Sequence, residues 1–159
     1  YGSAEASPHK QVSVSAILRE VIKAVDALAA QSGVDLQSSI CEHPCMVLGE
    51  AVQIKRAIQN VIINAVQASA EKKGSVAVTC TPKDFYVDIR IEDNGSGITP
   101  AQMSKIFDPY FTTKQGKSGT GLGLYITKKV LEDHNGSIKV DSTPDRGTTF
   151  TIRLPLLNS

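Results

Sequence analysis

The sequence predicts a two-layer α+β sandwich, in which helices cover one face of a mixed β-sheet. Segments with apolar residues at helical spacing alternate with short segments typical of strands, in the order helix, strand, helix, strand, strand, loop, helix, strand, strand. The 159 residues, of which 41% are hydrophobic and 21% charged, suit one globular domain with a sizeable core. Internal repeats and low-complexity tracts are absent from the sequence.

The first half of the chain predicts two helices that flank one strand. Apolar residues recur at helical spacing over residues 13–31, where Ser13 or Ser15 is a candidate N-cap. Residues 34–40 alternate between apolar and polar side chains and predict a strand. Residues 50–70 carry a broad apolar face and predict the strongest helix of the chain.

Four further strands are predicted in two pairs. Residues 75–80 and 85–92 are rich in β-branched and aromatic residues and are separated by a short polar turn, so they should form a hairpin. Residues 137–142 and 148–156 follow the same pattern at the end of the chain, joined by a turn that contains proline and glycine. The sheet therefore gains two strands from each pair.

A long connection and a third helix separate these two pairs of strands. Residues 98–120 are too long for a simple connection, and their aromatic anchor followed by lysines and glycines predicts a hinged lid. Residues 121–134 predict a helix that ends at Asn135-Gly136, with His134 as a cap or packing residue rather than a catalyst. The side chains expected to be buried in this helix are Leu122, Leu124, Tyr125, Ile126, Val130 and Leu131.

The net charge and the N-terminal residues argue against nucleic acid and membranes as the main partners. A net charge of +1 gives no case for nucleic acid or a membrane surface as the main partner. The sequence has no apolar run of membrane-spanning length and no signal-peptide pattern at its start. Residues 1–10 are small and polar, and we interpret them as the end of a linker or an expression-derived leader, so the domain is expected to span residues 11–157.

The three cysteines suit free thiols in a reducing compartment, because their number is odd. Cys41, His43 and Cys45 lie close together and raise the alternative of a metal site. A structural zinc site needs four ligands, normally with a second, distant pair, and the sequence offers no such pair. We therefore interpret the cysteines as small hydrophobic residues beside an exposed loop histidine.

Two glycine-rich turns flank the long connection, at residues 93–97 (DNGSG) and 119–124 (GTGLGL). Glycines let backbone N–H groups approach an anion, and the helix after the second turn points its positive end there, so phosphate is the expected anion. Asp93, at the end of a predicted strand, can accept a hydrogen bond from an exocyclic amine such as that of adenine. The alternative is that these glycines serve only turns and close packing.

Asn60 and Asn64 lie one turn apart on the strongest predicted helix. Asparagine is unfavourable in the middle of a helix, because its amide competes with the backbone for hydrogen bonds. One explanation is that both amides are buried and make all their hydrogen bonds within the protein. The other is that their side-chain oxygens are presented to a hard cation such as Mg²⁺. Together with the glycine turns, the pair favours a nucleotide site.

Four segments in this order resemble the motifs of one family. QNVIINAVQAS (59–69) is similar to an N box, DNGSG (93–97) to a first glycine box, FDPYFTTK (107–114) to an F box and GTGLGL (119–124) to a second glycine box. Over about residues 11–156, the chain resembles the catalytic, ATP-binding domain of bacterial two-component sensor histidine kinases. The larger group includes gyrase, the heat-shock chaperone ATPases and the mismatch-repair ATPases.

The resemblance implies the Bergerat ATP-binding fold, a mixed five-stranded sheet with three helices on one face and ATP between the helices and the lid. It implies that Asn64 ligates Mg²⁺, that Asn60 contributes to the metal and phosphate site, and that Asp93 binds the adenine amine. The two asparagines are the implied catalytic residues. The other implied nucleotide-binding residues are Gly95, Gly97, Lys114, Lys117, Gly119, Thr120, Gly121, Leu122 and Gly123.

The resemblance also implies the reaction. Hydrolysing members of the larger group carry a glutamate at the position of Asn60, and an amide has no basicity with which to activate water. We therefore expect slow hydrolysis and transfer of the γ-phosphate to a histidine on a separate phosphoacceptor and dimerisation domain. That domain is absent here, so this chain alone is not expected to autophosphorylate.

The implied partners are this phosphoacceptor domain and, through it, a response regulator, with no role for nucleic acid. The fragment is expected to be monomeric and cytoplasmic, and its parent to be a homodimer whose membrane attachment is not visible here. The alternatives are a serine kinase of anti-sigma type, a hydrolysing ATPase, and a degenerate docking module. Gln67 departs from the lysine or arginine that many kinases carry, and an aromatic residue expected near position 68 or 69 is absent.

Overall fold

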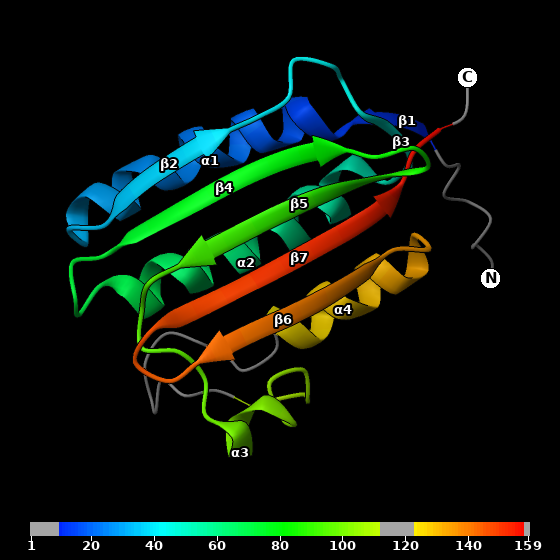
Figure 1. The fold of residues 1–159 in the computed structure, drawn as a ribbon. Helices are drawn as coiled ribbons and strands as arrows, with labels where there is room; N and C mark the ends of the chain where they lie inside the picture. Colours follow the sequence, from blue (N-terminus) through cyan, green and yellow to red (C-terminus); the bar gives the residue numbers. More distant parts are fainter. Residues whose placement is uncertain (1–9, 112–122, 158–159) are drawn as a thin grey trace.

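The computed structural model describes residues 10–111 and 123–157 and contains a five-stranded mixed sheet (Figure 1). In spatial order its strands are β2 (Asp35–Ser39), β4 (Ser75–Pro82), β5 (Tyr86–Asp93), β7 (Gly147–Pro155) and β6 (Ser137–Thr143). Strand β2 pairs with β4 in parallel, and the other three pairings are antiparallel. The predicted sheet and both predicted strand pairs are confirmed.

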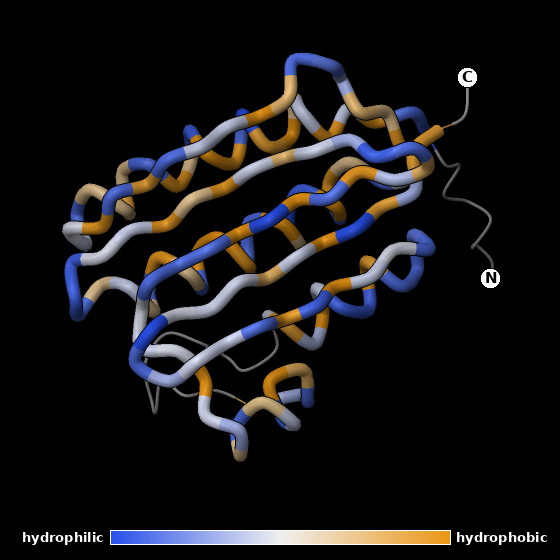
Figure 2. The backbone as a smooth tube through the Cα atoms, in the orientation of Figure 1, coloured by the Kyte–Doolittle hydropathy of each residue, from blue (hydrophilic) through white to orange (hydrophobic). Residues whose placement is uncertain are grey.

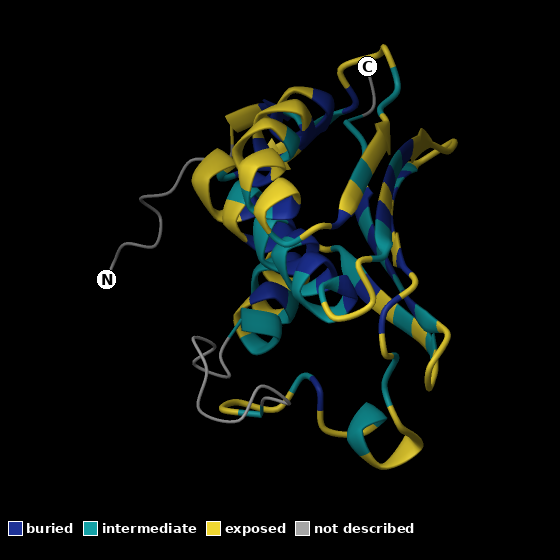
Figure 3. Ribbon diagram, turned by 90° about the vertical axis from the view of Figure 1, so that its left-hand side faces the viewer, coloured by how far each residue is buried: buried dark blue, intermediate teal, exposed yellow. Residues whose placement is uncertain are grey.

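Three helices form the second layer on one face of this sheet: α1 (Val14–Gln31), α2 (Ala51–Ser69) and α4 (Gly123–Asp133). Figure 3 shows this helical layer on one side and the sheet on the other. Ser13 is the N-cap of α1, because its hydroxyl accepts a hydrogen bond from the Ala16 N–H at 3.1 Å. None of the helices in the described ranges is long and apolar enough to cross a membrane.

The core lies between the two layers and follows from the period-two pattern of the strands. Along β5 and β7 every second residue is buried, and Figure 2 shows the same alternation of hydrophobic and hydrophilic positions. The largest fully buried side chains include Ile58, Ile62, Ile89, Ile91, Phe150 and Ile152. The opposite face of the sheet is polar, and there the Arg153 guanidinium donates to both carboxylate oxygens of Asp88 at 2.8 and 3.0 Å.

Three small elements were not predicted. Strands β1 (Lys10–Ser13) and β3 (Met46–Gly49) form a separate antiparallel pair, and each is only four residues long. The helix α3 (Pro100–Met103) begins the long connection, where Thr99 and Gln102 form a capping box. The predicted lid is therefore structured in its first part, while its remainder, residues 112–120, lies outside the described residues.

Helix α4 is rotated relative to the predicted apolar face. Ile126, expected in the core, is 39% exposed, whereas Thr127 is fully buried. The Thr127 hydroxyl donates to the Ala57 carbonyl of α2 at 3.3 Å, so a polar residue occupies the seam between the two helices. The predicted left-handed cap is confirmed, because Asn135 has a φ of 63°.

His134 joins the end of α4 to the start of α2. Its Nδ1 donates to the Val130 carbonyl at 2.7 Å, and its Nε2 accepts from the Glu50 backbone N–H at 3.1 Å. The ring is buried, and a Cβ at Gly49 would lie 2.3 Å from His134 Cδ2. The prediction that His134 is a packing residue is confirmed.

Candidate functional site

Asp93 ends β5 with its side chain turned into the protein, where it is only 5% exposed. Its Oδ1 accepts a hydrogen bond from the Gly95 N–H at 2.8 Å. Its Oδ2 is buried and has no hydrogen-bond partner among the described residues. A buried carboxylate oxygen without a donor is unfavourable, so this atom is suited to a hydrogen bond from a ligand.

The surroundings of Asp93 change its protonation equilibrium. Burial raises the pKa of the Asp93 carboxyl above its usual value, although the hydrogen bond from the Gly95 N–H opposes this rise, as does the Thr148 N–H, which faces the carboxylate without making a hydrogen bond to Oδ2. The charge of Glu92 adds to the increase and that of Lys72 reduces it. The Lys72 ammonium donates to the carbonyls of Gly95 and Asp145, at 3.1 and 2.8 Å, and so holds the turn after Asp93 in place.

The glycines after Asp93 are required by close backbone contacts. A Cβ at Gly95 would lie 2.3 Å from the Ala68 carbonyl oxygen at the end of α2. Gly97 has a φ of +76°, and a Cβ there would lie 2.2 Å from the Thr143 carbonyl oxygen. The turn at residues 93–97 is thus packed between the end of α2 and the turn that joins β6 to β7.

Ser69 is a polar residue of this region that the sequence prediction did not include. Its hydroxyl oxygen is buried and, like Asp93 Oδ2, has no hydrogen-bond partner within residues 10–111 and 123–157. The two groups lie on adjoining segments, because Ala68 contacts Gly95. Ser69 lies three residues after the buried Val66 and so falls on the apolar face of α2. This position on the helix is the sequence feature that could have indicated a buried hydroxyl.

Asn60 and Asn64 are half-buried on α2, and the first described turn of α4 lies beside Asn60. A Cβ at Gly123 would lie 4.0 Å from Asn60 Cγ. The buried hydrogen bond from the Thr127 hydroxyl to the Ala57 carbonyl holds the start of α4 against α2. Because the N-terminal end of a helix carries a partial positive charge, the arrangement combines amide oxygens with a region that favours an anion.

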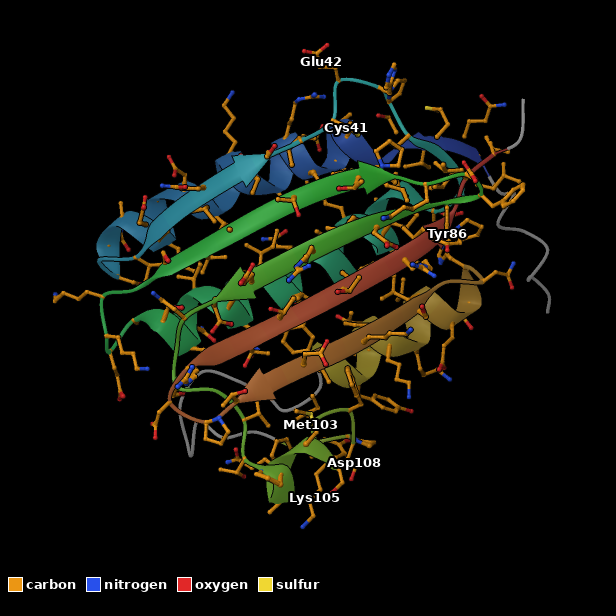
Figure 4. The ribbon with its side chains drawn as sticks, viewed as in Figure 1. Cys41, Glu42, Tyr86, Met103, Lys105 and Asp108 are labelled. Carbon is orange, nitrogen blue, oxygen red and sulfur yellow. The ribbon has the colours of Figure 1, made fainter. Side chains whose placement is uncertain are left out.

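The rest of the predicted site can be placed only in part. Lys114, Lys117, Gly119, Thr120, Gly121 and Leu122 lie outside the described residues. Figure 4 shows Met103, Lys105 and Asp108 in the segment that leads towards them, below the edge strand β6. In this segment Phe107 contacts α4, because the Lys128 ammonium lies 5.4 Å from the centre of its ring.

Comparisons with known proteins agree with this geometry. A family model described as histidine kinase-, DNA gyrase B-, and HSP90-like ATPase matches residues 49–158. The signal transduction histidine-protein kinase AtoS of Escherichia coli (strain K12) is 38% identical over 150 residues, which are 94% of this chain and 24% of AtoS. The chain therefore spans about a quarter of the length of that relative.

Solved structures give the same similarity. The nucleotide-free catalytic domain of histidine kinase ThkA matches with a TM-score of 0.81 at 27% identity, covering 93% of this chain and 95% of that one. Histidine kinase ThkA in complex with response regulator protein TrrA matches with a TM-score of 0.78 at 25% identity, covering 94% of this chain and 42% of that one.

Proposed function

The chain belongs to the family of histidine kinase-, DNA gyrase B- and HSP90-like ATPases and carries its ATP-binding domain, and we propose that it serves as the catalytic domain of a two-component sensor kinase. In this role it binds Mg·ATP and donates the γ-phosphate to a histidine on a separate phosphoacceptor domain. The observation that carries the proposal is the buried, partnerless Oδ2 of Asp93 at the end of β5.

Asp93 is proposed to recognise adenine. Its Oδ1 is already occupied by the Gly95 N–H, which fixes the plane of the carboxylate and leaves Oδ2 as the acceptor for the exocyclic amine. The hydroxyl of Ser69 is a second group that can bind the base or an ordered water beside it. Gly95 keeps this turn against α2 and Gly97 keeps it against the β6–β7 turn, so we assign both glycines to the shape of the base pocket.

Asn64, with Asn60 beside it, is proposed to hold Mg²⁺. Amide oxygens are hard donors, and Mg²⁺ accepts a small number of protein ligands while water and phosphate oxygens complete its coordination. When bound, Mg²⁺ would offset the negative charge on the phosphates. Gly123 and the positive end of α4 lie beside Asn60, which supports a position for the phosphates on this side of α2.

The proposed reaction is transfer rather than hydrolysis. Asn60 occupies the position from which a basic residue would activate water, and its amide cannot accept that proton. Catalysis by this chain then consists of positioning the nucleotide and neutralising its charge. The same proposal includes the nucleotide contacts predicted for Lys114, Lys117, Gly119, Thr120, Gly121 and Leu122.

The partners follow from the proposed reaction. We assign a phosphoacceptor histidine domain of the same kinase and, downstream, a response regulator; the complex of ThkA with TrrA supports the second assignment. The parent is proposed to be a homodimer, with this domain monomeric in isolation and located in the cytoplasm.

Calorimetric titration with a non-hydrolysable ATP analogue tests the site. We expect binding that Mg²⁺ strengthens and EDTA weakens, and we expect Asn64→Ala to lose the effect of Mg²⁺. Gln53→Ala is the matched control, because Gln53 is an exposed amide on the same helix. If Asn64→Ala kept the full enhancement by Mg²⁺, the metal assignment would be wrong.

Adding a phosphoacceptor domain with labelled ATP tests the reaction. Histidine transfer predicts label that is lost in acid and kept in alkali, with little phosphate released when the acceptor is omitted. Acid-stable label on serine would instead support the anti-sigma type of kinase. Steady phosphate release without any acceptor would support hydrolysis.

A further inference from the structure

The three cysteines of the chain converge at one place, away from the nucleotide site. Cys41 follows β2, Cys45 precedes β3, and Cys80 lies in β4. The Cys41 Sγ lies 3.0 Å from the Cys45 Sγ and 3.5 Å from the Cys80 Sγ, and all three sulfurs lie within 4.8 Å of one another. Along the sequence only Cys41, His43 and Cys45 are close together, because Cys80 is distant in the chain.

The cluster lies at the opposite end of the sheet from Asp93. In the β4–β5 pairing Cys80 is opposite Ile89, whereas Asp93 is opposite Val76. Figure 4 shows Cys41 at the start of the connection between β2 and β3, at the upper edge of the sheet. Any ligand of these thiols is therefore separate from the proposed nucleotide.

The spacing of the sulfurs suits a single thiophilic metal ion. A zinc–sulfur bond is about 2.3 Å long, so two sulfurs of a tetrahedral site lie roughly 3.8 Å apart. The distances of 3.0 and 3.5 Å from the Cys41 Sγ are somewhat shorter than this value, and all three sulfurs lie within 4.8 Å, so small rotations of the side chains can reach the tetrahedral spacing. Cys45 and Cys80 are 6% and 5% exposed, and Cys41 is half-buried, so an ion here would be shielded with one open side.

The surroundings of the cluster can balance its charge. Three thiolates and one divalent cation carry a net charge of −1, and the cluster lies against the first turn of α1, the positive end of that helix. The Ser15 hydroxyl of this turn is 3.4 Å from Cys41 Sγ, and the Arg19 guanidinium donates to the Cys41 carbonyl at 3.1 Å. Two backbone N–H groups of α1 hold the connection in place by donating to Pro44 and Cys45 at 3.2 and 3.1 Å.

The thiols differ in their ease of ionisation. Burial alone would raise the pKa of the Cys41 thiol, but hydrogen bonds from Ser15, Cys45 and Cys80 outweigh it, so the pKa of Cys41 lies below its usual value. Burial keeps the pKa of Cys45 and Cys80 above the usual value. Metal binding must displace these protons, so the affinity is expected to increase with pH.

We propose that Cys41, Cys45 and Cys80 bind one thiophilic divalent cation of the Zn²⁺ type, as a structural site that joins the β2–β3 connection to β4. Binding replaces three S–H bonds by three metal–sulfur bonds and releases three protons. The fourth ligand is a water molecule or the imidazole of His43, which is exposed between the two loop cysteines. A disulfide would use only two of the three sulfurs and leave the third in the same cluster.

Cobalt titration in a reducing buffer tests the proposal, since Co²⁺ occupies zinc sites and its thiolate complexes absorb strongly. The chain has no cysteine outside the cluster, so any thiolate-to-cobalt absorption arises there. We expect saturation at one Co²⁺ per chain, displacement by Zn²⁺, and loss of the absorption in Cys80→Ser. Ser39→Ala, an exposed change at the end of β2, is the matched control and should bind like the wild type.

Two results would overturn the proposal. One is a wild-type chain that has three titratable thiols and no cobalt absorption; the other is Cys80→Ser that keeps wild-type absorption and affinity. If the cysteine variants do not fold, the wild type still decides, because added Zn²⁺ must then raise its melting temperature and protect all three thiols from alkylation. His43→Ala identifies the fourth ligand through the change in the cobalt spectrum.

Discussion

At the scale of single residues, the carboxylate of Asp93 should determine the affinity for adenine. Asp93→Asn replaces one acceptor oxygen by a donor, and a hydrogen bond to a charged group contributes about 1.5–3 kcal/mol. We therefore expect ATP-analogue binding to weaken by roughly 10- to 150-fold in calorimetry. Asp84→Asn, an exposed change in the β4–β5 turn, is the control. Wild-type affinity in Asp93→Asn would exclude the assignment.

The raised pKa of Asp93 also predicts the pH dependence of stability. The folded chain holds this proton more tightly than the unfolded chain, so its contribution to stability is present below the unfolded pKa of about 3.9 and is lost as pH rises through the folded pKa. Urea unfolding of the wild type and Asp93→Asn over this range should show a difference that grows with pH in favour of the variant. A difference that does not change with pH would contradict the prediction.

Gly95 should not tolerate a side chain. In Gly95→Ala the new Cβ would meet the Ala68 carbonyl oxygen at 2.3 Å, and backbone atoms must move to relieve the overlap. The loss should be about 1–3 kcal/mol in urea unfolding, as for other overpacked sites. Gly123→Ala is the matched control, because among the described residues its Cβ would meet only Asn60, at 4.0 Å, and its stability should be unchanged or increased by up to about 1 kcal/mol.

At the scale of elements, His134 holds α4 against the start of α2. His134→Ala removes the buried imidazole and with it the acceptor of the half-buried Glu50 N–H, so we expect a loss of about 1–3 kcal/mol in urea unfolding. Gln at this position can restore an acceptor and should recover part of the loss. His43→Ala, at an exposed loop position and measured without metal, should change stability little. Equal stability of His134→Ala and the wild type would show that the joint contributes nothing.

The longer elements were predictable because each repeats its pattern over several turns or alternations. The 19 residues of α2 and the eight of β5 are examples, and their boundaries differ from the prediction by at most a residue or so. Strands β1 and β3 are too short to show a period, and only their pairing in space defines them. The face of α4 was misjudged because the buried Thr127 bonds a carbonyl of α2, which periodicity alone does not reveal.

The candidate site was predictable where a motif carried chemistry along the chain. The position of Asp93 at the end of a strand and the glycines after it are local features of this kind. Ser69 was missed, because a serine on a helix has many ordinary roles and only its burial without a partner distinguishes it. The proximity of Cys80 to Cys41 depends on the parallel pairing of β2 with β4, which no local pattern specifies.

At the scale of the whole molecule, nucleotide binding should stabilise the fold, because the proposed contacts come from both layers. Asp93 belongs to the sheet, and Asn60 and Asn64 belong to α2, so the site exists only when helices and sheet are assembled. A ligand at 100 times its dissociation constant stabilises the folded state by about 2.7 kcal/mol. For a chain of this size, this corresponds to a rise of roughly 5–11 °C in melting temperature.

Thermal melts of the wild type with Mg·ATP analogue, with analogue and EDTA, and with Mg²⁺ alone measure this coupling. The largest shift is expected with Mg·ATP analogue and a smaller one with analogue and EDTA. Mg²⁺ alone should give no shift. All samples are first freed of zinc, so that metal binding at the cysteine cluster does not contribute. Asn64→Ala should reduce the first shift to the size of the second, because it removes only the metal-dependent part. No shift with nucleotide in any condition would favour the docking module, since a chain that only docks gains no stability from ATP.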